Sequence, residues 1–147
     1  EMTSSLVGSE MCIRDSTDVK QAVEFVQCTG CGSLAVAVGN AHGAYVQTPN
    51  LDFDRIASLR SALPIPLVLH GCSDIPPEQL QESVRLGMSK FNIATEYFRA
   101  CYHGVVQHGD PTEKNGDMFR LMMETSENAI DFVRGKMRLL NPNKFTF

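Results

Sequence analysis

The sequence predicts an α/β fold with a parallel sheet, because short apolar strands alternate with helices along the chain. Apolar runs at 34–39, 67–70 and 90–94 have the length and composition of buried strands, and the first is expected to be buried on both faces. The segments between them place apolar residues at helical spacing. Strands that alternate with helices form right-handed βαβ units, which build parallel sheets. Three apolar strands leave exposed edges, so we expect part of a larger sheet or barrel.

The helices are bounded by capping residues, glycines and prolines. Asp18 can cap the first helix, and Gly30 ends it. The second helix is predicted over 53–62, with its apolar residues on one face. The remaining helices are predicted from Pro76-Pro77 to Gly87, after Thr95 as a cap, and over 117–139. The predicted order is therefore α-β-α-β-α-β-α-α.

Composition and charge limit the classes of function. The chain is 43% apolar and 20% charged, as soluble globular proteins are, and its net charge of −4 argues against a nucleic-acid surface. No apolar run approaches the roughly 20 residues of a membrane span. The acidic N-terminus does not resemble a signal peptide. We therefore expect a cytoplasmic protein with no nucleic-acid or membrane partner.

The five cysteines are expected to be reduced thiols. Their odd number and irregular spacing do not form a disulfide framework. Cys28 and Cys31 have the spacing of a CxxC pair, but a redox or zinc role would need a thioredoxin-like βαβ unit or a second pair. We interpret them as two thiols at the end of a helix.

Residues 1–16 are treated as a separate, non-native segment. Their sequence follows neither a helical nor a strand period. It also resembles a string that arises when sequencing adapters are translated. The predicted fold therefore comprises residues 17–147.

Polar residues follow each of the three predicted strands. The first strand runs into Asn40-Ala41-His42-Gly43, the second ends at His70-Gly71-Cys72-Ser73, and the third ends at Asn92-Ile93-Ala94-Thr95. The carboxyl ends of parallel strands hold the active site in barrels and in open α/β sheets alike. Three consecutive strands that deliver polar residues to one edge therefore predict an active site there.

Two of these residues, His42 and His70, suggest a metal site. Neutral imidazole is a common zinc ligand, and catalytic zinc usually takes three protein ligands and an open position. A third ligand would have to come from elsewhere in the protein. The alternative is that each histidine packs or forms hydrogen bonds near the core. His103 and His108 belong to a helical region and are interpreted as surface residues.

The segments after the second and third strands suit a phosphate. Gly71 lets backbone N–H groups approach an anion closely, and Ser73 adds a hydroxyl donor. Residues 92–95 stand at the start of a helix, where free N–H groups and the helix dipole favour an anion. The alternative reading is ordinary turn and cap chemistry, with Ser73 or Asp74 near one helix start and Thr95 at the next.

At these residues the chain resembles the class II fructose-bisphosphate and tagatose-bisphosphate aldolases. The resemblance is carried by TDVKQAVEFVQCTGCGSLAVAVGNAHGAYV (17–46), PLVLHGCSDIP (66–76) and GMSKFNIATE (87–96). The family's usual second block is HGGSG, whereas Cys72 and Asp74 replace two of its glycines here. The resulting SD pair is more similar to the tagatose-bisphosphate branch. The preferred sugar stays open.

The resemblance implies a partial TIM (β/α)8 barrel made of its last three strands and their helices. His42 and His70 would bind zinc, and Asn92 would contact the substrate near the reacting carbon. The loops would also hold dihydroxyacetone phosphate and, through backbone groups, a monovalent cation such as Na⁺ or K⁺. The implied substrate-binding residues are Gly43, Gly71, Cys72, Ser73, Asn92, Ile93, Ala94 and Thr95. The full-length protein would be a homo-oligomer, either a dimer or a tetramer.

The implied reaction is the reversible aldol cleavage of fructose or tagatose 1,6-bisphosphate to dihydroxyacetone phosphate and glyceraldehyde 3-phosphate. Zinc would act as the Lewis acid, so no Schiff-base lysine is needed. Lys90 is expected to open a strand at the end opposite the site and is given no role. Two alternatives remain: a non-catalytic member of the same fold, and a metal-free phosphate-binding α/β module.

This polypeptide alone is expected to have negligible aldolase activity. The family's block with a further histidine ligand and the acid–base aspartate lies N-terminal to the matching region, and residues 1–16 do not resemble it. We also expect the isolated chain to be poorly soluble, because an unclosed barrel exposes apolar strand edges.

Overall fold

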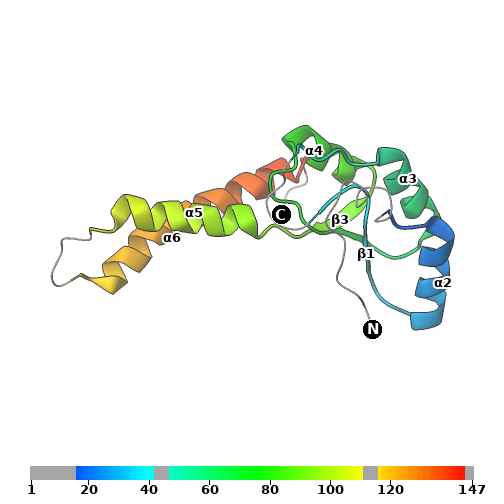
Figure 1. Ribbon diagram of the computed structural model, residues 1–147, viewed down its shortest axis with the longest axis horizontal. Coiled ribbons are helices and arrows are strands. Elements are labelled where there is room, and N and C mark those ends of the chain that lie inside the picture. The colour runs from blue at the N-terminus through cyan, green and yellow to red at the C-terminus, as the bar shows by residue number, and fades with distance from the viewer. Residues whose placement is uncertain (1–15, 42–46, 111–115, 145–147) are drawn as a thin grey trace.

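The computed structural model describes residues 16–41, 47–110 and 116–144, and its elements follow the predicted order. Figure 1 shows a sheet with helices in one part of the molecule and a long helical hairpin in the other. The elements are α2 (Val19–Thr29), β1 (Leu34–Val36), α3 (Phe53–Ala62), β2 (Leu67–Leu69), α4 (Pro77–Arg85), β3 (Met88–Phe91), α5 (Thr95–His108) and α6 (Met118–Leu139).

Aspartate side chains begin three of the helices. The carboxylate of Asp18 accepts a hydrogen bond from the backbone N–H of Gln21 at 3.0 Å, and α2 ends at Gly30 with a left-handed φ of 63°. Asp52 caps α3 over the predicted range 53–62, and Asp117 caps α6. The predicted cap at Asp18 and the predicted start at residue 53 are confirmed, whereas the last helix begins at Met118, one residue later than predicted. In each case a short carboxylate satisfies a free N–H group of the first turn.

The three strands form a parallel sheet in the order β1-β2-β3. Strand β3 was predicted over 90–94 but spans Met88–Phe91. It begins earlier because Gly87, with a φ of 104°, turns the chain directly from α4 into the strand, where the Met88 side chain is buried. Leu67 lies opposite Met88 and Val68 opposite Lys90, so Ser89 is an extra residue in β3 and forms a β-bulge.

The hydrophobic core lies between one face of the sheet and helices α2, α3 and α4. The strands contribute alternate residues to it, namely Val36, Leu67, Leu69 and Met88. Ala35 and Lys90, opposite Val68 on the other face, are exposed. The prediction that the first strand is buried on both faces is therefore wrong, because Ala35 is exposed, whereas the central strand β2 is buried on both faces.

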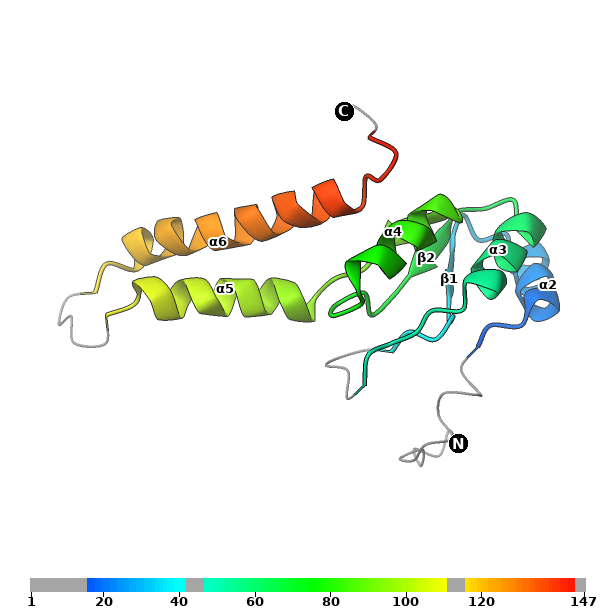
Figure 2. The same ribbon diagram turned by 90° about the horizontal axis from the view of Figure 1, so that it is seen from above.

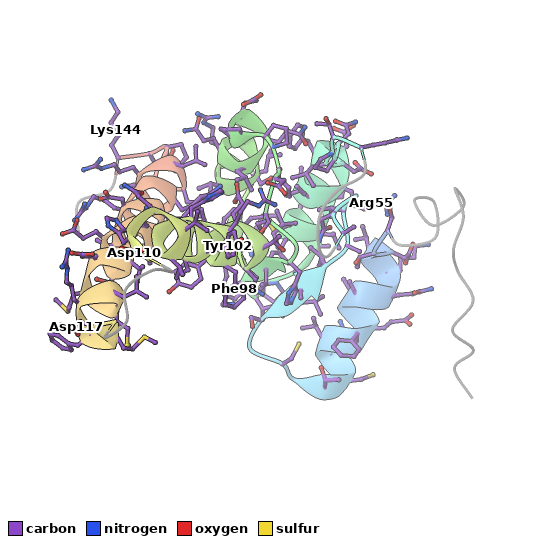
Figure 3. The ribbon with its side chains drawn as sticks, turned by 60° about the vertical axis from the view of Figure 1, so that its left-hand side comes forward. Arg55, Phe98, Tyr102, Asp110, Asp117 and Lys144 are labelled. Carbon is purple, nitrogen blue, oxygen red and sulfur yellow. The ribbon has the colours of Figure 1, made fainter. Side chains whose placement is uncertain are left out.

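Helices α5 and α6 form an antiparallel hairpin that extends away from the sheet (Figures 1 and 2). The large hydrophobic side chains that are exposed in the described part of the chain lie almost entirely on this hairpin, Phe25 of α2 excepted. Phe98 and Tyr102 lie along α5 (Figure 3) and are 67% and 65% exposed. No helix within the described ranges combines the length and hydropathy that crossing a membrane requires.

Candidate active site

His70 and Asn92 lie side by side at the edge where the strands end. His70 follows β2 and Asn92 follows β3, and the Asn92 Nδ2 lies 2.9 Å from the His70 Nδ1. The backbone N–H of Asn92 donates to the Leu69 carbonyl at 2.9 Å, which continues the pairing of the two strands beyond β3. The sheet therefore brings the predicted metal ligand and the predicted catalytic residue into direct contact.

Lys90 also belongs to this group, contrary to the prediction from the sequence. Its Nζ donates a hydrogen bond to the Asn92 Oδ1. The prediction failed because β3 begins at Met88, so Lys90 is the third residue of the strand rather than its first. Residues two apart in extended chain project on the same side, and this spacing is the signal in the sequence that could have identified Lys90.

The contact with Lys90 fixes which end of the Asn92 amide faces the imidazole. Because the ammonium group of Lys90 can only donate, the amide oxygen must face it, and the amide N–H group then faces His70. The ring nitrogen that receives this N–H group accepts a hydrogen bond and carries no proton. Zinc needs an unprotonated ring nitrogen, so the Asn92 amide would have to turn away from this one for His70 to bind the metal there. With that change, His70 would fit one position of a zinc site.

The rest of the predicted metal site is not described. His42 and Gly43 lie outside the described residues. Within residues 16–41, 47–110 and 116–144, no three histidine, cysteine, aspartate or glutamate side chains gather as a metal centre. Among the described residues, His70 is therefore the one histidine at this edge that could bind the metal.

Asn40, to which the sequence analysis gave no role, ties the loop after β1 to the loop after β2. Its Oδ1 accepts from the Val38 N–H at 2.8 Å, and its Nδ2 donates to the His70 carbonyl at 2.9 Å. Gly39 has a φ of 92°, and a Cβ there would lie 2.6 Å from the Asn50 carbonyl oxygen. The chain that leads to His42 is therefore held beside His70 by a side-chain amide and a glycine turn.

The loop after His70 contains a buried thiol. The Cys72 side chain is fully buried, and its Sγ donates to the Leu69 carbonyl at 3.0 Å. The Cys72 N–H donates to the Asn92 carbonyl at 3.1 Å. Burial raises the pKa of the Cys72 thiol to about 12. The side chain therefore holds the loop to the strand ends and does not reach the surface.

Ser73 and Asp74 join the same loop to α5. Ser73 is 3% exposed, and its Oγ accepts from the Glu96 N–H at 3.3 Å. Asp74 accepts two hydrogen bonds of 3.0 Å from the guanidinium of Arg99. These hydrogen bonds lower the pKa of the Asp74 carboxyl group, as does the positive charge of Arg99. Gly71 and Asp74 both have a φ of 61°, so the loop turns twice through left-handed conformations.

The predicted cap at Thr95 is wrong. Thr95 is the first residue of α5, and the cap position belongs to Ala94, whose side chain makes no capping hydrogen bond. The Ser73 hydroxyl takes over this function from another segment, because it accepts from Glu96 in the first turn. Of the other residues predicted to bind substrate here, Ile93 is half-buried against the core and Ala94 is exposed.

His103 and His108 lie away from this edge. Both belong to α5 and are exposed. The His108 Nδ1 lies 3.7 Å from the Glu124 Oε2 of α6. They are surface residues of the hairpin, as predicted.

Comparison with known proteins supports the resemblance. The family model for fructose-bisphosphate aldolase class-II matches residues 5–144. The crystal structure of the YdjI aldolase from Escherichia coli K12 is 36% identical with a TM-score of 0.79, over 88% of this chain and 47% of that one. A fructose-bisphosphate aldolase from Campylobacter jejuni is 20% identical with a TM-score of 0.72, over 87% of this chain and 46% of that one, and supports the fold alone.

These matches cover nearly all of this chain but less than half of each solved structure. The three parallel strands and their helices correspond to part of the TIM barrel in those aldolases. The family match begins within residues 1–16, and the non-native origin of that segment stays a prediction. The chain belongs to the class II fructose-bisphosphate aldolase family.

Proposed function

We propose that residues 17–147 form the C-terminal part of the barrel domain of a zinc-dependent ketose-bisphosphate aldolase. The reaction is the reversible cleavage of fructose or tagatose 1,6-bisphosphate to dihydroxyacetone phosphate and glyceraldehyde 3-phosphate. The observation that carries the proposal is the 2.9 Å contact between His70 and Asn92, at the edge where parallel-sheet enzymes bind substrate. Family membership supports the same reaction class.

His70 and His42 would hold zinc together with a ligand from the missing part of the barrel. The metal, when bound, supplies a Lewis acid that polarises the ketose oxygens. Backbone groups of the surrounding loops would hold a monovalent cation, either Na⁺ or K⁺.

Asn92 is the proposed catalytic residue. Its amide N–H group lies beside the metal ligand and is oriented by Lys90, so it can donate to an oxygen on which negative charge develops. A fixed donor of this kind is worth about 3–4 kcal/mol of transition-state stabilisation in other enzymes.

The loop after β2 and the start of α5 would bind the phosphate of dihydroxyacetone phosphate. Gly71 turns the loop through a left-handed conformation, and a serine hydroxyl that accepts one hydrogen bond still has a proton to donate. Thr95 begins α5, where the helix dipole favours an anion. Gly43, Ile93 and Ala94 would contribute backbone contacts. Cys72, whose side chain is buried and whose N–H donates to the Asn92 carbonyl, would shape the site by holding the loop.

The test uses the longer reading frame that contains residues 17–147, purified with zinc and assayed with both sugar bisphosphates. We expect cleavage of at least one of them, and the ratio of the two kcat/KM values gives the preference at C4. His70→Ala should lose bound zinc and lower kcat by at least about 10³-fold, because one of three ligands is removed. His103→Ala is the control, since His103 is exposed on α5.

Two outcomes would contradict the proposal. Full-length protein that binds zinc but cleaves neither sugar indicates a non-catalytic member of the fold. A zinc content that His70→Ala leaves unchanged indicates a phosphate-binding module without a metal.

A cytoplasmic, homo-oligomeric enzyme belongs to the same proposal and rests on the family. We also propose that residues 1–147 alone are inactive, because they span less than half of the length of the aldolases that they match. Appreciable cleavage by this chain with added zinc would contradict that. The genomic frame upstream of codon 17 decides whether residues 1–16 are native.

A further inference from the structure

The loop at 71–74 is attached to α5 at two points. Ser73 is bonded to the backbone of Glu96, and Asp74 is bonded to the side chain of Arg99. Glu96 and Arg99 are three residues apart and lie on neighbouring positions of the same helix face. Residues of this loop are also the proposed phosphate ligands. The contacts that hold this loop against α5 therefore also set the distance between the loop and the start of α5, the two segments of the proposed phosphate site.

Asp74 adopts a backbone conformation that residues with a side chain rarely keep without support. Its φ is 61°, in the left-handed region, and the residue that follows, Ile75, is buried. The block to which this loop is similar carries glycine at the corresponding position, and glycine reaches this conformation without cost. An aspartate here needs a compensating interaction if the loop is to hold its shape.

Arg99 supplies that interaction. Both of its terminal nitrogens bond to the Asp74 carboxylate at 3.0 Å, in the paired geometry that fixes the two planar groups relative to each other. The pair joins a loop to a helix that begins 21 residues later in the sequence, so it constrains tertiary structure. The pair of Arg85 and Glu82, by contrast, lies within one turn of α4 and constrains only that helix.

We propose that Arg99 is a positioning residue for the phosphate site, acting through Asp74 to hold the loop at 71–74 against the start of α5. The inference rests on the proposed function, because it assumes that this loop binds the phosphate of the substrate. Arg99 itself does not contact the substrate. Its removal frees Asp74 to leave the left-handed conformation, and Ser73 then loses its place beside Glu96.

The experiment is a double-mutant cycle in the full-length, zinc-loaded protein, with two readouts. One is the dissociation constant for inorganic phosphate, measured by calorimetry, and the other is the separate measurement of KM and kcat. Arg99→Ala should raise both the dissociation constant and KM about tenfold, and change kcat less than threefold, because the loop is loosened and Asn92 is not. Asp74→Ala should have the same effects on the dissociation constant and KM. Alanine is also strained in the left-handed conformation, and it lacks the carboxylate that Arg99 binds.

The second arm of the cycle replaces Asp74 by glycine. Glycine keeps the loop conformation without help from Arg99. In the Asp74→Gly background, Arg99→Ala should therefore raise the dissociation constant less than twofold. Arg85→Ala is the matched control, because Arg85 and Arg99 side chains are 48% and 47% exposed and each bonds one carboxylate. It should leave both readouts unchanged.

Two results would overturn the inference. If Arg99→Ala leaves phosphate binding and KM within twofold of the wild type, the ion pair does not position the loop. If Arg99→Ala weakens binding equally in the Asp74→Gly background, Arg99 acts on the anion directly. Where Arg99→Ala fails to fold, Arg99→Lys serves instead, because lysine keeps the charge but loses the paired geometry.

The phosphate measurement also separates this inference from the proposed function. Full-length protein that cleaves no sugar bisphosphate refutes the proposed function, and the cycle in phosphate affinity still decides whether Arg99 positions the loop. Protein that cleaves the substrate normally with Arg99→Ala refutes the inference alone.

Discussion

Cys72 and Ser73 are neighbours that serve different purposes. The Cys72 thiol is buried beneath the loop and bonded to a strand carbonyl, whereas the Ser73 hydroxyl bonds to the start of α5. Cys28, on the last turn of α2, is exposed. The chain therefore carries thiols of very different accessibility, and this difference can be measured.

We predict that Cys72 of the folded protein reacts with iodoacetamide at pH 8 on the order of 100-fold more slowly than Cys28. Burial keeps reagent away from the Cys72 thiol and raises its pKa to about 12, so little thiolate forms. Mass spectrometry of peptides sampled over time gives both rates. In denaturant the two thiols should react alike, and equal rates in the folded protein would contradict the buried position.

The sequence correctly predicted that His70 and Asn92 follow strands and lie at one edge of the sheet. Their position depends only on where a strand ends, and parallel strands end at one edge. It did not predict the contributions of Lys90, Asn40 and Arg99. Their hydrogen bonds depend on how loops and helices pack, and short motifs do not contain that information. The cap predicted at Thr95 failed for the same reason, since Ser73 reaches it from another segment.

At the scale of elements, helix α3 depends on its cap. The Asp52 carboxylate accepts from the backbone N–H of Arg55 at 2.9 Å and pairs with the Arg55 side chain at 3.0 Å. The backbone hydrogen bond is the main cause that lowers the pKa of Asp52. A carboxyl group whose pKa is lowered in the folded protein stabilises it above the pKa of the unfolded chain. That stabilisation is lost as the pH falls through the lowered value.

We predict that Asp52→Ala lowers the free energy of unfolding of the full-length protein by about 1 kcal/mol at pH 7, as removal of a helix cap does. Asp52→Asn should cost less, because asparagine also accepts from the first turn. The difference between wild type and Asp52→Ala should shrink as the pH falls below about 4, the ordinary pKa of an aspartate, and through the lowered pKa of Asp52. Urea denaturation at pH 7 and at low pH measures this difference in the free energy of unfolding. If the difference is the same at low pH, the Asp52 carboxylate does not stabilise the helix as a cap. Asp54→Ala, within the exposed first turn, is the control.

Helix bounds were easier to predict than strand bounds. Helix starts are marked by aspartates at 18, 52 and 117, which act locally. The start of β3 depends on the turn at Gly87 and on pairing with β2, so its position was misjudged by two residues. Strand pairing is a relation between distant segments, and the composition of one segment does not determine it.

At the scale of the whole molecule, apolar side chains gather on the hairpin of α5 and α6. No residue of α6 is buried, although the helix has 22 residues. Helical spacing of apolar residues predicted α6 correctly. The same spacing, however, occurs in helices that pack against the core of their own chain and in helices that pack against another chain or domain. The exposure of the hairpin was therefore not predictable from periodicity, whereas the alternation of strands and helices was enough to predict the fold class.

We predict that residues 1–147 self-associate in solution at micromolar concentration. Phe119 and Met122 are 75% and 63% exposed on α6, and removal of such surfaces from water favours association. Phe119→Ser with Met122→Gln should shift the sedimentation velocity distribution towards the monomer. Phe25→Ser on α2 is the control, because Phe25 is 52% exposed but isolated from the hairpin. If residues 1–147 are monomeric at all concentrations, the exposed apolar side chains of the hairpin do not drive association.

The extra residue at Ser89 determines to which face of the sheet the later side chains of β3 point. Side chains alternate between the two faces of a strand, so a single insertion exchanges the faces of everything that follows. With the insertion, Phe91 points toward the helices opposite Leu69, and Asn92 points the other way, toward His70. In a regular strand that kept Ser89, Met88, Lys90 and Asn92 would lie on one face, and the Asn92 amide would point with Met88 into the apolar layer. The bulge at Ser89 therefore decides on which side of the sheet Asn92 meets His70.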